Sequence, residues 1–270
     1  MIPPLHAALL GLVEGLTEFL PVSSTGHLVL AAQWLGLHGE AVKTFEVVIQ
    51  AGALGAVIGL YRQRVVSMWR GLLGRHPQGR RLLVHLVISF IPAAVLGLAL
   101  HRTIKERLFT TWPIVAALAV GGVLMIGVER WTASRPRTGG QPLEAMTWNQ
   151  ALIIGIAQCF SLWPGTSRSM VTIVGGILLG FSSPVAAEYS FLLALPTLGA
   201  ATLFDAAQGG RLLFEQTGAL SIACGFLTAA VVAMLTIRGL IRYLTHRGLA
   251  PFGWYRLGLA ALIWAMARLA

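Results

Sequence analysis

Apolar residues dominate this chain in long blocks, and polar residues are confined to short stretches between them. A block of about 20 apolar residues is long enough to cross a hydrocarbon core as a helix. Two regions, 3–37 and 148–180, are longer, but a segment rich in Pro, Ser and Gly interrupts each of them in the middle. The remaining blocks predict full spans at residues 44–61, 82–101, 112–131, 186–206, 217–237 and 251–269.

The two interrupted regions resemble each other. Gly11–His27 has the sequence GLVEGLTEFLPVSSTGH, and Gly155–Met170 has the sequence GIAQCFSLWPGTSRSM. Each is an apolar stretch that meets a proline and then a run of small hydroxyl residues. The matched pairs are Glu14 with Gln158, Thr17 with Ser161, Phe19 with Trp163 and, after one residue of slip before the prolines, Ser24 with Ser167. This similarity predicts an internal repeat.

The segments after the two breaks, His27–Leu37 and Met170–Gly180, are too short to cross a membrane. At 1.5 Å per residue each would be roughly 16 Å long, about half of a hydrocarbon core. They predict re-entrant hairpins that enter and leave on one side. Three spans separate the hairpins, so the second hairpin enters from the opposite face.

We therefore predict an all-α polytopic membrane protein with an inverted-topology repeat, six full transmembrane spans and two re-entrant helical hairpins. The chain 1–270 would form a single membrane domain, with repeat halves 1–140 and 141–270. Composition agrees, because 56 % of the residues are hydrophobic and only 11 % are charged, against about 25 % charged in soluble domains. Cys159 and Cys224 lie in apolar stretches and predict neither a disulfide framework nor a metal site.

The net charge of +10 does not indicate a nucleic-acid partner, because the basic residues lie in loops between apolar blocks. This distribution indicates how the chain is oriented in the membrane, because the side of the membrane with more Arg and Lys is the cytoplasmic side. One side has Arg62, Arg64, Arg70, Arg75, Arg80, Arg81, Arg130, Arg135, Arg137, Arg238, Arg242, Arg247 and, nearby, Arg256. The other has Lys43, Arg102, Lys105, Arg107, Arg211 and Arg268. The first hairpin and both termini would then open to the outer face.

Two acids in the first hairpin are the first candidates for chemistry. Glu14 and Glu18 are four residues apart, so they share one helix face at a separation of about 6 Å. Carboxylates this close repel each other unless a cation lies between them or they share a proton. Oxygen ligands of this kind favour Mg²⁺ or Ca²⁺. We predict that Glu14 and Glu18 bind such a divalent cation.

The breaks supply hydroxyl groups next to ionisable side chains. In the first break, Ser23, Ser24 and Thr25 precede a helix expected to start near His27, where main-chain N–H groups favour an anion. Serine and threonine in this position also serve simply as helix caps. The His27 imidazole can move protons near neutral pH. These residues predict a site for an anionic substrate.

The second break has the sequence Pro-Gly-Thr-Ser-Arg-Ser, with Thr166, Ser167 and Ser169 around Arg168. The planar guanidinium suits phosphate oxygens. A salt bridge from Arg168 to Glu14 or Glu18 is the structural alternative. If the two breaks meet, they enclose one polar cavity with the parts needed to cleave a phosphate ester or anhydride.

These two motifs, EGLTEFLPVSSTGH at Glu14–His27 and PGTSRS at Pro164–Ser169, resemble the signatures of the bacitracin-resistance type of undecaprenyl-diphosphate phosphatase. The segment FEVVIQ at Phe45–Gln50 extends the resemblance. It implies a multi-pass enzyme of the bacterial inner membrane, dependent on a divalent metal, with its active site open to the periplasm. Such an enzyme removes one phosphate from a C55 polyprenyl diphosphate and so recycles the lipid carrier of peptidoglycan synthesis.

The resemblance implies catalytic roles for Glu14, Glu18, Ser24, His27 and Arg168. We predict substrate binding by Ser23, Thr25, Thr166, Ser167 and Ser169 together with Arg168. Ser24 is the first choice of nucleophile, activated by His27 or a glutamate; attack by His27 or by a metal-activated water are alternatives. A lipid flippase or ion-coupled transporter is the alternative function, because inverted repeats with broken helices are common in transporters. The sequence leaves a homodimer open.

Overall fold

The computed structural model describes residues 2–37, 39–108, 110–133 and 140–269, and the named elements in these ranges are all helical. The first half contains α1 (Pro4–Thr17), α2 (Ser24–Trp34), α3 (Glu40–Leu60), α4 (Arg62–Leu72), α5 (Pro77–Arg107) and α6 (Thr111–Ala133). The second half contains the short 3₁₀ helices η1 (Leu143–Ala145) and η2 (Cys159–Leu162), with α7 (Trp148–Gln158), α8 (Arg168–Leu178), α9 (Ser183–Thr217), α10 (Ala219–His246) and α11 (Ala250–Leu269).

Several of these helices are long and apolar enough to cross a membrane. Four described segments meet both conditions: Pro77–Leu100, Thr111–Thr132, Ser183–Phe204 and Ala219–His246. A fifth is reached if Phe45–Leu60 and Arg62–Leu72 are counted as one span bent by 83°. The chain is therefore a multi-pass helical membrane protein. The sequence pattern does not predict helix α4, because it places residues 62–81 in a loop between two spans.

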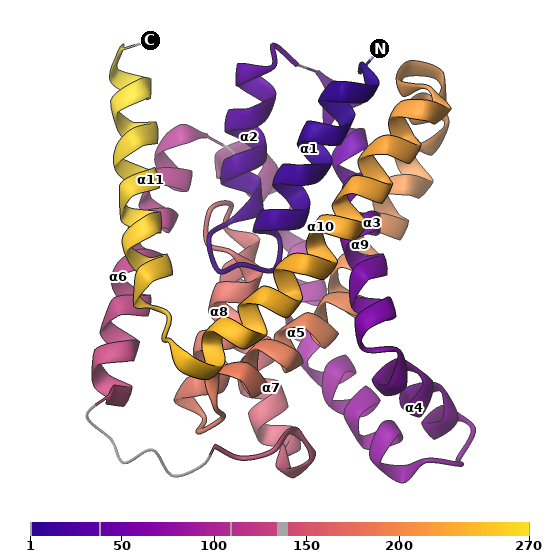
Figure 1. Cartoon of the computed structure of the whole chain (residues 1–270), viewed down its shortest axis with the longest axis vertical. Helices are drawn as coiled ribbons and strands as arrows, with labels where there is room; N and C mark the ends of the chain where they lie inside the picture. Colours follow the sequence, from indigo (N-terminus) through magenta and orange to yellow (C-terminus); the bar gives the residue numbers. More distant parts are fainter. Residues whose placement is uncertain (1, 38, 109, 134–139, 270) are drawn as a thin grey trace.

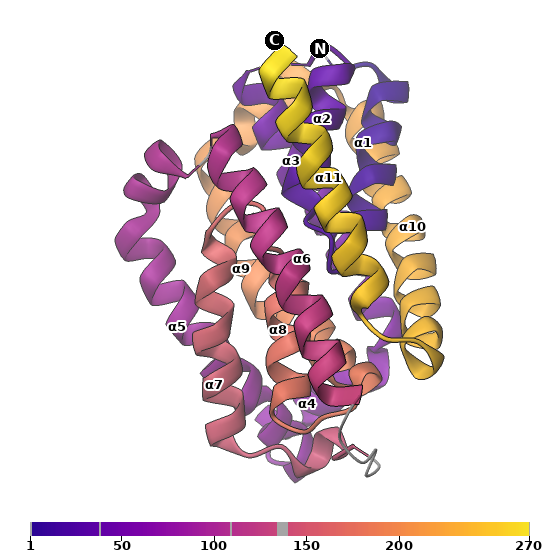
Figure 2. The same cartoon turned by 90° about the vertical axis from the view of Figure 1, so that its left-hand side faces the viewer.

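The two interrupted regions are helical hairpins at opposite ends of the molecule. Figures 1 and 2 show α1 and α2 in the half that holds both chain termini, and α7 and α8 in the other half. The second arms, α2 and α8, have 11 residues each, as predicted. They begin at Ser24 and Arg168, a few residues earlier than predicted. Ser24 and Thr25 consequently belong to the first turn of α2 rather than to the break.

The starts of α2 and α8 correct the predicted alignment of the breaks. Ser23 has φ 75° and Ser167 has φ 73°, and they are the non-glycine residues with positive φ in the described chain. Each caps its helix by accepting a hydrogen bond from the main-chain N–H three residues later, as Ser commonly does at this position. Ser23 therefore corresponds to Ser167, and Ser24 corresponds to Arg168. The slip introduced to align the prolines is wrong, because the caps set the helix starts.

Close helix crossings hold both hairpins in the bundle. Helix α1 packs mainly against α10, and α7 packs mainly against α5. Small residues make these crossings close: a Cβ at Gly11 would overlap the carbonyl oxygen of Gly225, and one at Gly155 would lie 2.6 Å from the carbonyl oxygen of Ser89. Each hairpin is thus supported by a long helix from the other half of the sequence.

We expect Gly11→Ala to destabilise the protein by about 1–3 kcal/mol, because the added methyl group must push α1 away from α10. Gly127→Ala is the matched control, since a Cβ at Gly127 in α6 would meet nothing within 4 Å. Alanine there should be neutral or stabilising by up to about 1 kcal/mol. Thermal unfolding midpoints of the two variants in detergent test the prediction; equal midpoints would refute it.

One basic residue is misplaced by the charge count. Arg256 is predicted near the cytoplasmic loops, but its side chain is fully buried in the middle of the bundle. It therefore does not contribute to the topology signal. Arg135 and Arg137 lie outside the described residues, as do the side chains of Lys43, Lys105 and Arg211.

Candidate active site

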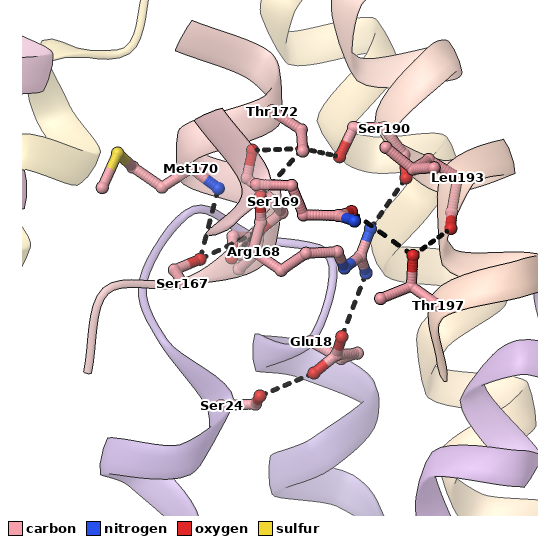
Figure 3. Close-up of polar contacts among 12 residues, drawn as sticks. Glu18, Ser24, Ser167, Arg168, Ser169, Met170, Thr172, Ser190, Leu193 and Thr197 are labelled. Atoms are coloured by element: carbon pink, nitrogen blue, oxygen red, sulfur yellow. Dashed lines mark hydrogen bonds and ion pairs between the residues drawn. The ribbon is translucent and has the colours of Figure 1, made fainter. Parts of the chain in front are cut away.

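The ends of the two hairpins meet, and side chains from both contact each other directly. Arg168, the first residue of α8, donates from Nη2 to Glu18 Oε1 at 3.0 Å. Ser24, the first residue of α2, donates from Oγ to Glu18 Oε2 at 2.6 Å. Figure 3 shows Glu18 between the serine and the arginine. The predicted meeting of the two breaks is present, and Arg168 uses Glu18 as its anionic partner.

The surroundings hold Arg168 and Glu18 in a fixed orientation. Arg168 Nη1 donates to the Ser190 carbonyl oxygen at 2.7 Å, and its guanidinium carbon lies 5.9 Å from the centre of the Phe19 ring. Its Nε has no hydrogen-bond partner. The side chains of Arg168 and Glu18 are only 8 % and 7 % exposed. Because they touch and are nearly buried, they do not line an open cavity.

A cavity lies away from the two breaks, at the edge of α4 and α5. It has a volume of about 150 Å³, and its lining includes Arg64, His76, Arg81, His85 and Glu144. None of these lining residues belongs to the two breaks, and the polar cavity expected at the hairpins stays a prediction.

His27 is oriented by two hydrogen bonds that do not involve the acids. Its Nδ1 lies 2.7 Å from the Ser23 carbonyl oxygen and its Nε2 lies 2.7 Å from Tyr255 Oη. A carbonyl oxygen only accepts, so Nδ1 carries the hydrogen, and in the neutral ring Nε2 accepts from the tyrosine hydroxyl. Glu18, rather than His27, is consequently the hydrogen-bonded base beside Ser24.

Glu14 is the least satisfied polar group of the site. The whole residue is buried, and neither carboxylate oxygen has a hydrogen-bond partner. Glu18, Glu46 and Arg168 all act on it electrostatically. A buried carboxylate without donors is costly unless a cation compensates its charge or it takes up a proton. The described residues contain no group of three or more His, Cys, Asp or Glu side chains that could hold a metal ion, so a cation at Glu14 would need ligands from the substrate or from water.

The hydroxyl groups of the second break are tied into the structure. Ser167 Oγ lies 3.0 Å from Ser169 Oγ and caps α8 through the Met170 N–H. Ser169 Oγ donates to the Leu20 carbonyl oxygen at 2.9 Å and so links α8 to the first break. Thr166 lies in the turn before α8, where its main-chain N–H donates to the Trp163 carbonyl. These residues lie beside Arg168, as predicted.

Two further polar side chains, those of Gln158 and Glu188, have structural contacts. Gln158, the counterpart of Glu14, is fully buried; it donates to the Ser89 carbonyl at 3.5 Å and accepts from Thr197 at 3.3 Å. Glu188 forms a 3.0 Å ion pair with Arg64 in α4, and Arg64 also binds Glu144 at 2.6 Å. The hydrogen bond from Arg64 lowers the pKa of Glu144. Glu188 thus ties α9 to α4.

Two neighbouring residues of α11 that the sequence patterns do not predict contact the hairpins: Tyr255 contacts the first, and Arg256 contacts both breaks. Tyr255 holds Nε2 of His27. Arg256 donates to four main-chain carbonyl oxygens, among them those of Pro21 and Gly165. The only signal available in the sequence is an arginine and a tyrosine inside an apolar block, where ionisable residues commonly mark a site.

The fold and this site define a multi-pass membrane protein with a buried polar centre assembled from two broken helices. Comparison with protein families goes further: residues 7–262 match the family described as bacitracin resistance protein BacA. The match covers nearly the whole chain, and the protein belongs to this family.

Curated relatives agree with this assignment. The chain is 54 % identical to an undecaprenyl-diphosphatase of Sorangium cellulosum over 258 residues, covering 95 % of this chain and 84 % of the relative. It is 45 % identical to an undecaprenyl-diphosphatase of Nitrosomonas europaea over 259 residues, covering 96 % and 93 %. It is 44 % identical to undecaprenyl-diphosphatase 2 of Rhodospirillum rubrum, covering 97 % and 94 %.

Proposed function

We propose that this protein is a phosphatase that hydrolyses undecaprenyl diphosphate to undecaprenyl phosphate and inorganic phosphate. The observation that carries the proposal is the contact of Ser24, Glu18 and Arg168 across the two hairpins. A nucleophile bound to a base, with the base oriented by a third group, is the arrangement that covalent catalysis needs. The similar proteins are named as diphosphatases, and none of the three is named as a flippase or transporter.

In the proposed first step, Ser24 Oγ attacks the terminal phosphorus of the diphosphate. The Oγ–P bond forms, the P–O bond to the bridging oxygen breaks, and undecaprenyl phosphate leaves. Glu18 Oε2 accepts the hydroxyl proton over the existing 2.6 Å hydrogen bond. Glu18 passes this proton to the bridging oxygen of the departing undecaprenyl phosphate. Water then attacks the phosphoserine: Glu18 takes a proton from the water, the Oγ–P bond breaks, and Glu18 returns the proton to Ser24 Oγ as inorganic phosphate is released.

Arg168 has two roles in this proposal. It holds Glu18 toward Ser24, and its unpartnered Nε–H is a donor for a phosphate oxygen. A guanidinium stabilises the charge that spreads over the phosphoryl oxygens in the transition state. We propose that Thr25 and Thr166 donate to the remaining diphosphate oxygens. Ser167 and Ser169, whose hydroxyls bind each other and the Leu20 carbonyl, would position the start of α8, and Ser23 would shape the site as the cap of α2.

His27 takes a different role from Glu18. Its Nε2 faces Tyr255, whose side chain is half exposed, so this pair lies on the accessible edge of the site. We propose that His27 exchanges protons with the phosphate after Tyr255 releases Nε2. Direct attack by Nε2 would require the same release and would lack the adjacent base that Ser24 has.

We propose Glu14 and Glu18 as the ligands of a divalent cation, Mg²⁺ or Ca²⁺. The two oxygens of Glu14 have no hydrogen-bond partner and would serve as ligand atoms. Mg²⁺ is commonly held by one or two carboxylates, with phosphate oxygens completing its coordination shell. When bound, the ion supplies neutralisation of the diphosphate charge.

We expect Glu14→Gln to abolish the stimulation of phosphate release by Mg²⁺ or Ca²⁺, because the amide keeps the shape of the side chain but removes its charge. Glu144→Gln, on the ion pair with Arg64, is the matched control and should retain metal stimulation. The check is a titration of each ion against initial rate, with ion binding measured directly by calorimetry. A Glu14→Gln protein with the wild-type metal response would remove Glu14 from the ligand set.

We propose the complete membrane arrangement as six spans and two re-entrant hairpins in the bacterial inner membrane, with the first hairpin and the active site open to the periplasm. The correspondence of the caps at Ser23 and Ser167 supports an inverted repeat. So does the reciprocal packing of α1 on α10 and of α7 on α5. One chain supplies every residue of the proposed site, so the chemistry does not require a homodimer.

Phosphate release from farnesyl diphosphate by the detergent-purified protein, with Mg²⁺ or Ca²⁺ present, tests the proposed function. A phosphatase releases one phosphate per substrate and leaves farnesyl phosphate. A flippase or transporter would release none, and that result would overturn the proposal.

A further inference from the structure

The side chain of Arg256 in α11 is the largest fully buried polar group among the described residues, and it lies between the two breaks. It is 0 % exposed. Its partners are four main-chain oxygens: Nε reaches Leu118 at 3.3 Å, Nη1 reaches Pro21 at 3.3 Å, and Nη2 reaches Ala117 at 3.0 Å and Gly165 at 2.9 Å. None of these partners is a carboxylate. Removing a guanidinium from water has a large desolvation cost. The burial of Arg256 with four main-chain hydrogen bonds therefore requires an explanation.

The two loop carbonyls that Arg256 binds are equivalent positions of the two breaks. Pro21 lies three residues before Ser24, and Gly165 lies three residues before Arg168. Ser24 and Arg168 are the first residues of α2 and α8. One guanidinium therefore fixes the chain at the same point of both breaks, through separate Nη atoms. The other two bonds anchor the guanidinium to α6.

The packing of α6 leaves a place for this side chain. A Cβ at Gly121 in α6 would overlap Arg256 Nη2 and lie 2.9 Å from its Cζ. A second glycine, Gly122, lets Gly253 of α11 approach, since a Cβ there would lie 2.8 Å from the Gly253 carbonyl oxygen. The close contact between α6 and α11 thus places the Arg256 side chain beside the two breaks.

We propose that Arg256 is a positioning residue that sets the separation of Ser24 and Glu18 in the first hairpin from Arg168 in the second. It acts through the backbone of the two breaks and does not touch the reacting atoms. The consequence for turnover rests on the proposed phosphatase function. The consequence for the loops does not, because it concerns main-chain hydrogen bonds alone.

Arg256→Lys is the main test variant. Lysine keeps the charge but has a single nitrogen, which cannot bind the Pro21 and Gly165 oxygens in the geometry of a fork. We expect kcat to fall about 100-fold, the loss typical of a displacement of about 1 Å in a catalytic group, while KM changes less than about 3-fold. Gly121→Ala should give the same split, because its methyl group displaces the guanidinium. Arg268→Lys, an exposed position of α11, is the control and should keep the wild-type kcat.

Amide hydrogen exchange provides the readout that does not depend on activity. In Arg256→Lys and Gly121→Ala, exchange should accelerate at least tenfold at residues 19–26 and 163–170 and stay unchanged in α10. Acceleration throughout the protein would show a general structural role and overturn the proposal, as would wild-type kcat with unchanged loops. If Arg256→Lys does not fold, Gly121→Ala decides by the same criteria. If the wild-type protein releases no phosphate but both loops loosen as described, the proposed function fails and the positioning role stands.

Discussion

Arg168→Ala is expected to reduce phosphate release by about 10³-fold or more, the scale seen when an arginine that stabilises phosphoryl transfer is removed. The substitution has two effects in this structure. It removes the unpartnered donor Nε that is proposed to bind a phosphate oxygen, and it frees Glu18 from the 3.0 Å ion pair that orients it toward Ser24. The measurement is kcat/KM for farnesyl diphosphate with the purified protein.

The same substitution is expected to destabilise the protein, because the Glu18 carboxylate stays buried beside the space that the Arg168 side chain filled. Breaking a buried ion pair by removing one partner typically costs about 3–5 kcal/mol. The double variant Glu18→Gln with Arg168→Met separates folding from catalysis, since it replaces the pair with neutral side chains of similar size. It should unfold near the wild-type temperature and still be inactive. Arg242→Ala, an exposed arginine of α10, is the activity control. Wild-type turnover in Arg168→Ala would remove the arginine from the mechanism.

The sequence predicts the fold class and the meeting of the hairpins because both follow from local patterns. Long apolar blocks predict membrane-spanning helices, and two breaks of similar composition predict two hairpins. The ionisable residues within these breaks, Glu18 and Arg168, then find each other, as expected of charges in an apolar environment.

The register of the breaks could not be predicted from composition. Pro21 and Pro164 are the most obvious residues to align between the two breaks, but aligning them shifts the rest of the repeat by one residue. The helices instead begin where a serine side chain accepts from the main chain, at Ser23 and Ser167. The corrected register pairs Ser24 with Arg168, so the first residue of each second arm supplies a side chain to Glu18. The proposed nucleophile and its cationic partner are thus equivalent positions of the repeat.

Contacts contributed by α11 were also beyond the sequence pattern. Tyr255 is 228 residues from His27, and Arg256 is 235 residues from Pro21. No periodicity connects positions so far apart. The charge count groups Arg256 with the arginines of the nearby loops, and it therefore assigns Arg256 to the cytoplasmic side. Only tertiary packing shows that its charge is used inside the bundle.

Ser24→Ala is expected to lower turnover by at least about 10³-fold, because it removes the proposed nucleophile while leaving the proposed base and transition-state groups in place. The ion pair of Glu18 with Arg168 does not involve the serine hydroxyl, so the variant should fold normally. Ser67→Ala, which removes a hydroxyl that donates to the Arg64 carbonyl oxygen within α4, should be fully active.

The phosphoenzyme distinguishes Ser24 from the other candidate nucleophiles. Rapid acid quenching of the wild-type protein during turnover should give a phosphate ester that peptide mass spectrometry assigns to Ser24. Glu18→Gln should slow both the formation and the hydrolysis of this ester, because one carboxylate serves as base in both steps. The ester should survive acid, whereas a phosphohistidine would be acid-labile and recovered only after alkaline quenching. Label on His27 under those conditions, or active enzyme with no label under either, would transfer the attack to the imidazole or to water and leave Glu18 as the base of a different nucleophile.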